Sequence, residues 1–350
     1  MPIEFKRYPV DKVRTLAQEI YRGMGATPDE VEILADQIVH AAMRTHPGQG
    51  QGLEKLPRVW ERLTGGTILP GAPLEVIKDG PAWSHIDGHR GWGIVIAAKA
   101  MDIACEKAKK FGLGMVVVRY SNHLGTCQYH AMRALKHGLI GLCMTNAGPE
   151  MAPWGGITPM LGTNPWGVAV PNPDFPVVLD MALSQSGKGM VRWHMVEGKP
   201  IPRNWAYAPD GSETEDPELA MQGPLVPMGE FKGTGLSLIT DVLTGVMSGG
   251  AFGTAPYSDP KNHDVSHLLL AIDPACYIEL DQFGGRMQAF QQELKSSKLK
   301  PGVDEIFLPG EMEHRRQKEA ERHGMPIAVD TVAALARLCV ELQVPFGLEG

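Results

Sequence analysis

Cysteine is scarce in this sequence. The five residues, Cys105, Cys127, Cys143, Cys276 and Cys339, are scattered singly along a chain of 350. No two of them form a CxxC pair and their number is odd, so neither a disulfide framework nor a zinc site is indicated. The pattern favours reduced thiols, and we therefore expect a cytoplasmic protein without a metal site.

Excess charge and long apolar segments are also missing. The formal net charge is -7 and the pI is near 6.0, which gives no reason to expect a nucleic acid or a membrane surface as partner. The N-terminal stretch MPIEFKRYPVDKVRTL has no apolar signal core, and no segment is long enough to span a bilayer. We expect neither kind of partner.

The two common glycine-rich nucleotide motifs are absent from the sequence. No GxGxxG stands between a first strand and a helix, and there is no GxxxxGK[ST]. The ordinary Rossmann fingerprint and the P-loop are therefore missing, which disfavours a Rossmann dinucleotide fold.

The chain is long enough for two domains or one large one, and 43% of its residues are hydrophobic. The segment before Met43 is typical of two helices, the second opened by a capping box of Thr27 and Glu30. From about residue 73 to 256, short apolar runs alternate with helices and glycine-rich turns, a pattern typical of α/β structure. We expect an α/β domain at 73–275 and helical segments at 1–72 and 276–350 that pack on each other.

One strand, turn and helix pattern surrounds a histidine. The run GLGMVVVRY (112–120) has the continuous apolar character of a strand buried on both faces, and helical spacing begins after it. Ser121 or Asn122 can cap that helix, which places His123 among free backbone N–H groups. Such a histidine serves chemistry or only hydrogen-bonds a loop, and this stretch leaves both open.

Glycine-bearing segments offer a second candidate site. In PMGEFKGTGLSL (227–238), glycines surround Lys232 just ahead of an apolar helix. Close backbone approach, helix N–H groups and a positive charge suit a phosphate or carboxylate, but the more ordinary interpretation is a surface turn with a solvated lysine. Asp180, at the end of an apolar strand, is either a ribose or amide acceptor or the cap of the next turn.

Six motifs in order resemble the type-2 malate/L-lactate dehydrogenase family. They are SNHLG, MTN…PWGG, GTNPWGVAVP, DMALSQSGKG, PIPRNWAYAPDGSETEDP and PMGEFKGTGLSLITDVLTGVMSGG. The family includes ureidoglycolate and sulfolactate dehydrogenases, 2,3-diketo-L-gulonate reductase and cyclic-imine reductases. The resemblance, from about residue 9 to the C-terminus, implies NAD(P)-dependent interconversion of a 2-oxo acid and a 2-hydroxy acid by a homodimer with a non-Rossmann, mixed-sheet α/β fold.

The resemblance also implies roles for particular residues. His123 becomes the general acid/base, because an imidazole can give and retake the proton of the reduced carbonyl oxygen near neutral pH. Polar pocket contacts are implied for Asn122, Thr145 and Asn146. Dinucleotide contacts, with NAD or NADP, are implied for Pro176, Val177, Val178, Leu179, Asp180, Met181, Ala182, Phe231, Lys232, Gly310 and Glu311.

One loop departs from the family pattern S-H-G-V/I-x-R-[LF]-P. Here the sequence is MRTHPGQGQGLEKLPRVW, which puts Gly50, Gln51 and Lys55 where serine, histidine and arginine are usual. Lysine keeps the positive charge but loses the bidentate fork for a carboxylate. We predict Gln51 and Lys55 as substrate contacts, and His46 either as a second catalytic group or as an exposed loop histidine.

The altered loop leaves the activity open between alternatives. One is a working oxidoreductase on a 2-oxo acid, a 2-hydroxy acid or a cyclic imine carboxylate. The other is a relative that binds a dinucleotide or metabolite without turnover.

Overall fold

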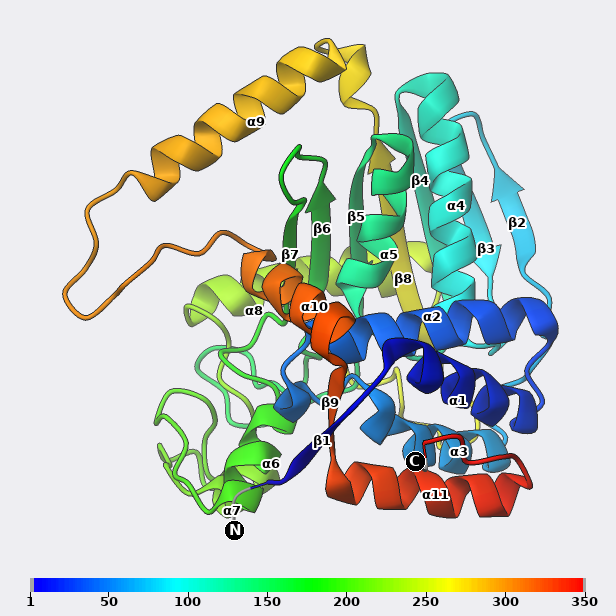
Figure 1. The fold of residues 1–350 in the computed structure, drawn as a ribbon, viewed down its shortest axis with the longest axis vertical. Coiled ribbons are helices and arrows are strands. Elements are labelled where there is room, and N and C mark those ends of the chain that lie inside the picture. Colours follow the sequence, from blue (N-terminus) through cyan, green and yellow to red (C-terminus); the bar gives the residue numbers. More distant parts are fainter. Residues whose placement is uncertain (1–2, 349–350) are drawn as a thin grey trace.

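A mixed seven-stranded sheet forms the centre of the computed structural model, which describes residues 3–348 (Figure 1). In spatial order its strands are β2 (Glu75–Asp79), β3 (Trp83–Asp87), β4 (Leu113–Ser121), β8 (Val265–Ile272), β5 (Ile140–Thr145), β6 (Trp166–Val170) and β7 (Val177–Met181). Only β3 and β4 pair in parallel. The prediction of a mixed, non-Rossmann α/β fold is confirmed.

The three valines of β4 explain why this strand lies in the middle of the sheet. Val116 and Val118 face the core under α4 (Gly93–Phe111) and α5 (Cys127–Arg133), whereas Val117 faces the opposite core. Successive side chains of a strand point to opposite faces, so a run without polar residues requires cover on both. The predicted buried strand is confirmed.

Two glycines allow α4 and α5 to approach the sheet closely. A Cβ on Gly114 of β4 would lie 1.9 Å from the Ala104 carbonyl oxygen of α4, and one on Gly141 of β5 would lie 2.1 Å from that of Ala131 in α5. Side chains at these positions would push the helices off the sheet. The glycines therefore fix the positions of both helices.

Helices from both ends of the chain share one hydrophobic core. They are α1 (Val10–Gly23), α2 (Pro28–Arg44), α3 (Leu56–Thr64), α10 (Glu311–His323) and α11 (Val329–Leu342). A two-stranded antiparallel sheet of β1 (Phe5–Tyr8) and β9 (Met325–Ala328) joins the two ends. The backbone N–H of Thr27 donates to Glu30 Oε2 at 2.8 Å, as the sequence predicts for the start of α2.

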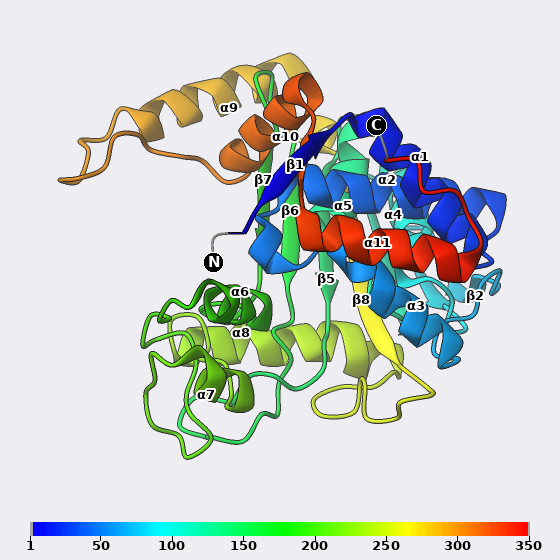
Figure 2. The same ribbon diagram turned by 60° about the horizontal axis from the view of Figure 1, so that its bottom comes forward.

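Helix α9 (Leu280–Lys295) lies apart from that core. It projects from the body beyond the turn between β6 and β7 (Figures 1 and 2). Its apolar residues Leu280, Phe290 and Leu294 are exposed. Within the C-terminal segment, α10 and α11 contribute to the core of the N-terminal helices, whereas α9 does not.

The other helices gather at one end of the sheet, as Figure 2 shows for α6 (Lys188–Glu197), α7 (Pro217–Gln222) and α8 (Phe231–Asp241). A π-helical turn, η4 (Val242–Val246), continues α8. Short 3-10 turns are η1 (Pro47–Gln49), η2 (Leu53–Lys55), η3 (Ala134–His137) and η5 (Pro274–Cys276). Within residues 3–348, no helix is both long and apolar enough to cross a membrane.

Candidate active site

His123 lies in the loop between β4 and α5. The strand ends at Ser121, and the helix begins at Cys127 with Thr126 as its N-cap. The prediction that Ser121 or Asn122 caps the helix is therefore wrong, because β4 extends through Ser121 and the loop uses Asn122 elsewhere.

The side chain of Asn122 holds this loop in place. Its Nδ2 donates to the carbonyl oxygens of Thr67, Arg90 and Gly91 at 2.9 to 3.1 Å. The side chain is buried, and its Oδ1 has no hydrogen-bond partner among the described residues. The contacts of Asn122 fix the backbone that carries His123.

Both ring nitrogens of His123 have partners. The backbone N–H of Gly125 donates to Nδ1 at 3.0 Å, and Nε2 lies 3.0 Å from Lys55 Nζ. Burial, together with the nearby charge of Lys55, lowers the pKa of His123 well below its usual value. The imidazole is therefore neutral at physiological pH.

Lys55 stands at the junction of η2 and α3, where Leu56 begins the helix. Its Nζ donates to Gln51 Oε1 at 2.5 Å. Burial, reinforced by the charge of Arg62, lowers the pKa of Lys55 to about 7. The two residues that replace the usual histidine and arginine thus contact each other, and one of them contacts His123.

His46 is engaged elsewhere. Its Nδ1 accepts the N–H of Gly48 at 3.0 Å at the start of η1, and its ring meets Trp193 edge to face at 5.3 Å. The hydrogen bonds of residues 3–348 include none between His46 and either His123 or Lys55. The structure places His46 as the cap of a turn against α6.

Thr145 is the last residue of β5, and Asn146 follows it directly. Thr145 Oγ1 lies 2.8 Å from His267 Nδ1, and Asn146 Oδ1 accepts the N–H of Ser266 at 2.8 Å. The other ring nitrogen of His267 lies 2.8 Å from Ser121 Oγ. These polar groups join the ends of β4, β8 and β5 into one support.

His267 is the member of this network that the sequence analysis missed. It is fully buried, and burial lowers its pKa to about 3. A single histidine inside the apolar run of β8 was the only signal for it. Its neutral ring can bridge Ser121 and Thr145 because one nitrogen donates while the other accepts.

The three segments predicted to hold a dinucleotide meet along β7, the edge strand of the sheet. At one end, the N–H of Val178 donates to the Pro309 carbonyl at 3.0 Å, just before Gly310 and Glu311. At the other end, the N–H of Met228 donates to the Leu183 carbonyl at 2.8 Å, just ahead of α8.

Two glycines make these approaches possible. A Cβ on Gly310, at φ +83°, would lie 2.8 Å from Val178 Cβ, and one on Gly233 would lie 2.6 Å from the Leu183 carbonyl oxygen. Phe231 and Lys232 stand beside this contact with exposed side chains. The segment from Pro176 to Ala182 therefore lies between both partners.

Asp180 connects β7 with the His123 loop. Its Oδ2 accepts the N–H of Gln128, in the first turn of α5, at 3.2 Å. Partial removal of water by the surrounding protein raises the pKa of this carboxyl to about 7, although the residue as a whole is exposed. The buried Arg44 donates to Gln128 Oε1 at 2.9 Å and lies behind the same turn.

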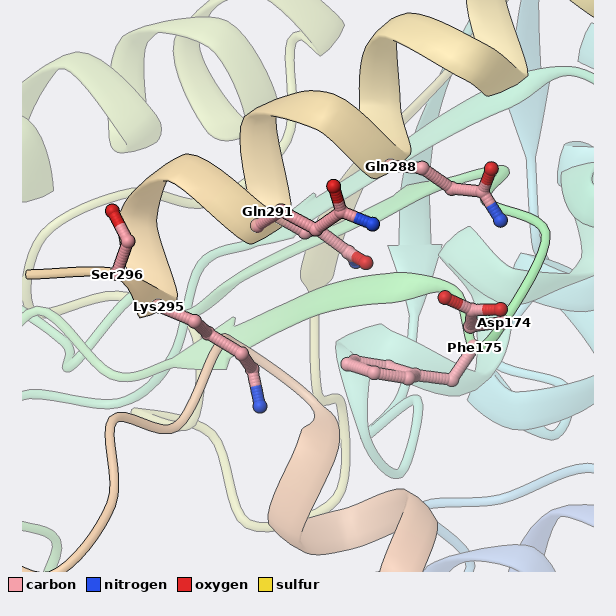
Figure 3. Close-up of a pocket in the computed structure, with 7 residues that line it drawn as sticks. Asp174, Phe175, Gln288, Gln291, Lys295 and Ser296 are labelled. Carbon is pink, nitrogen blue, oxygen red and sulfur yellow. The ribbon is translucent and has the colours of Figure 1, made fainter.

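Glu311 is engaged in an ion-pair network rather than exposed at the edge. Its Oε1 accepts from Lys295 Nζ at 2.7 Å and from Arg315 Nη2 at 2.6 Å. Lys295 also lines a cavity of about 450 Å³ between α9 and the turn that carries Asp174 and Phe175 (Figure 3). Glu311 thus links the start of α10 to α9.

Residues 3–348 hold no cluster of three or more His, Cys, Asp or Glu that could ligate a metal.

Known proteins resemble the chain over nearly its full length. The family model described as malate/L-lactate dehydrogenase matches residues 8–336. A malate dehydrogenase of Pyrococcus abyssi is 34% identical, with 95% of each chain covered. A (2R)-3-sulfolactate dehydrogenase (NADP(+)) of Chromohalobacter salexigens is 30% identical, over 91% of this chain and 94% of that protein. The crystal structure of malate dehydrogenase from Entamoeba histolytica superposes with a TM-score of 0.93 at 27% identity, covering 98% of this chain and 99% of that one.

Proposed function

Because the chain belongs to the malate/L-lactate dehydrogenase family, we propose that it is an oxidoreductase that interconverts a 2-oxo acid and a 2-hydroxy acid with NAD or NADP. The observation that carries this proposal is the contact of His123 with Lys55, which puts two titratable nitrogens 3.0 Å apart. Asp180 and α5 join the loop of His123 to β7, where the dinucleotide segments meet. An acid/base centre connected to these segments suits reduction of a carbonyl.

The segments along β7 suit a dinucleotide. Gly310 and Gly233 bring backbone close to backbone, Lys232 offers an exposed positive charge, and Phe231 an exposed aromatic face. We assign cofactor binding to residues 176–182, to Phe231 and Lys232, and to Gly310 and Glu311. When bound, the nicotinamide supplies or accepts the hydride.

The charges around His123 suit an acidic substrate. Lys55, Arg58 and Arg62 follow at spacings of three and four, so they share one face of α3. Neither Arg58 nor Arg62 forms an ion pair with another described residue. We propose that this basic face, with Gln51, attracts the carboxylate. Asn122, Thr145 and Asn146 would support the pocket, and a catalytic role for His46 stays a prediction.

We further propose a homodimer that works in the cytoplasm. The apolar side chains Leu238, Ile239, Val242, Val246 and Met247, on α8, on η4 and directly after η4, are 41 to 52% exposed. Such a continuous apolar face is typical of a surface covered by a second copy. The cysteines are free thiols, as in reducing compartments.

The decisive experiment follows nicotinamide absorbance with a panel of 2-oxo acids and one cyclic imine carboxylate, with NADH and NADPH in parallel. We expect oxidation of one reduced cofactor by at least one 2-oxo acid. Turnover of the imine alone would favour a cyclic-imine reductase. Cofactor binding without turnover of any compound would support the non-catalytic alternative and refute the proposal.

A further inference from the structure

The hydrogen bonds of His123 determine where its proton lies. A neutral imidazole has one N–H donor and one acceptor nitrogen. Because the N–H of Gly125 donates to Nδ1 at 3.0 Å, Nδ1 is the acceptor. The ring proton is therefore on Nε2, which faces Lys55 Nζ at 3.0 Å.

This arrangement favours an uncharged Lys55. A neutral amine can accept the N–H of His123 Nε2 with its lone pair while it donates to Gln51 Oε1 at 2.5 Å. An ammonium group has three donors and no acceptor, so its N–H would oppose the N–H of the ring. The hydrogen bonds thus favour the neutral form of Lys55.

Burial of Lys55 and the charge of Arg62 act in the same direction. Arg62 and Arg58, on α3, oppose a positive charge at Lys55, whereas Glu54 and Glu150 favour one. Burial has the largest effect, and the pKa of Lys55 falls to about 7. At neutral pH the side chain can therefore exist both with and without its proton, as an acid/base catalyst must.

We propose that Lys55 Nζ, rather than the imidazole of His123, is the atom that exchanges the proton with the substrate oxygen. The proposal rests on the proposed function and makes Lys55 a catalytic residue. Both nitrogens of His123 already have partners, so His123 becomes the positioning residue that favours the neutral amine.

The proton and electron balance is simple in both directions. In reduction, the carbonyl carbon accepts the hydride of the reduced nicotinamide and the C–O π pair moves to oxygen. The ammonium form of Lys55 then gives one proton to that oxygen, so that an N–H bond breaks and an O–H bond forms. The resulting amine accepts the hydrogen bond of His123, and water restores its proton. In oxidation, the neutral amine takes the hydroxyl proton.

Lys55 also has a simpler interpretation, as a clamp for the substrate carboxylate in place of the usual arginine. The two roles differ in what arginine would do at this position. A guanidinium binds a carboxylate with two parallel hydrogen bonds but does not release a proton at physiological pH. Lys55→Arg should therefore preserve or improve a clamp and disable a proton donor.

The first test compares steady-state kinetics of Lys55→Arg and Lys55→Ala with the unmodified protein. We expect kcat to fall by about 100-fold or more in both, the usual scale for a positioned acid or base, and ethylamine to restore part of the activity of Lys55→Ala. Lys199→Arg, at an exposed lysine, is the control and should match the unmodified protein. Lys55→Arg with kcat within about threefold, or a loss confined to KM, would overturn the proposal.

The second test measures the titration of Lys55 without turnover. The rate at which acetic anhydride acetylates each lysine is followed against pH by mass spectrometry, with Lys199 as the internal reference. We expect a midpoint near 7 for Lys55, and a higher midpoint in His123→Ala, because the donor to the amine is lost. A midpoint equal to that of Lys199 would refute the proposal.

The outcomes separate this proposal from the function on which it rests. If the unmodified protein oxidises no nicotinamide cofactor with any 2-oxo acid, the proposed function fails and the role of Lys55 fails with it. If the unmodified protein and Lys55→Arg are both active, only the role of Lys55 fails.

Discussion

Gly310→Ala should destabilise this protein through both its backbone conformation and its packing. The residue has φ +83°, and an added Cβ would lie 2.8 to 2.9 Å from the Cβ, N and O of Val178. A left-handed conformation costs a non-glycine residue about 1–2 kcal/mol. Forcing a methyl against a packed strand costs about 1–3 kcal/mol more. The expected loss of unfolding free energy is therefore about 2–5 kcal/mol, the sum of both.

Gly302→Ala isolates the contribution of the clash. Gly302 has nearly the same φ, +81°, but an added Cβ would have no neighbour within 4 Å. It should lose only the conformational part, about 1–2 kcal/mol. The difference between the two losses of unfolding free energy then measures the steric cost of a Cβ at position 310 against β7.

Urea unfolding provides the stability of both variants, and calorimetric titration with NADH and NADPH provides the cofactor affinity. We expect weaker binding in Gly310→Ala alone, because the methyl displaces the edge strand to which we assign the dinucleotide. Equal losses of stability in the two variants, with unchanged cofactor affinity in both, would refute both the steric contact of Gly310 with β7 and the dinucleotide site assigned there.

Four further predictions concern other parts of the molecule. His123→Ala should lower turnover at pH 7 by less than Lys55→Ala does, because His123 positions the amine and does not itself exchange the proton, and dinucleotide affinity should stay nearly unchanged; near-normal turnover would remove this residue from the mechanism. Lys232→Ala should weaken dinucleotide binding in a direct titration, and unaltered affinity would contradict the assigned phosphate or ribose contact. Leu238→Glu should dissociate the dimer in light scattering, whereas Val340→Glu, at an exposed position on α11, should not; a monomeric unmodified protein at micromolar concentration would contradict both. His46→Ala should cost about 1 kcal/mol of stability through the lost cap and change kcat little, and a large drop in kcat would restore it to the catalytic residues.

Local sequence patterns were sufficient to predict several helices and strands. The capping box at Thr27 and Glu30 depends on residues three apart, and the buried strand at 113–121 on an unbroken apolar run. Such signals need no knowledge of distant neighbours. The predicted N-cap of α5 was wrong because Ser121 and Asn122, although both are common capping residues, form long-range hydrogen bonds instead. Ser121 Oγ contacts His267, and Asn122 holds the carbonyl oxygens of Thr67, Arg90 and Gly91.

The position of α9 could not be derived from its sequence. Its pattern predicts a helix, which the structure has, but Phe290 and Leu294 are exposed. Periodicity indicates that a helix has an apolar side and does not identify what covers it. In contrast, only the family resemblance indicated that the three segments predicted to bind the dinucleotide would meet, because no local pattern links residues 178, 231 and 310.

The altered loop between Arg44 and Lys55 has contacts that its sequence does not predict. From the sequence alone, Gln51 is a lost histidine and Lys55 is a lost guanidinium fork, and nothing indicates that the two residues interact. The structure shows that the replacements form one unit, because η2 points Lys55 toward both Gln51 and His123. A glutamine can orient an amine without charging it, and a lysine can titrate near neutral pH where an arginine cannot. The two substitutions are therefore understood better as an exchange of the proton-carrying group than as the loss of a substrate clamp.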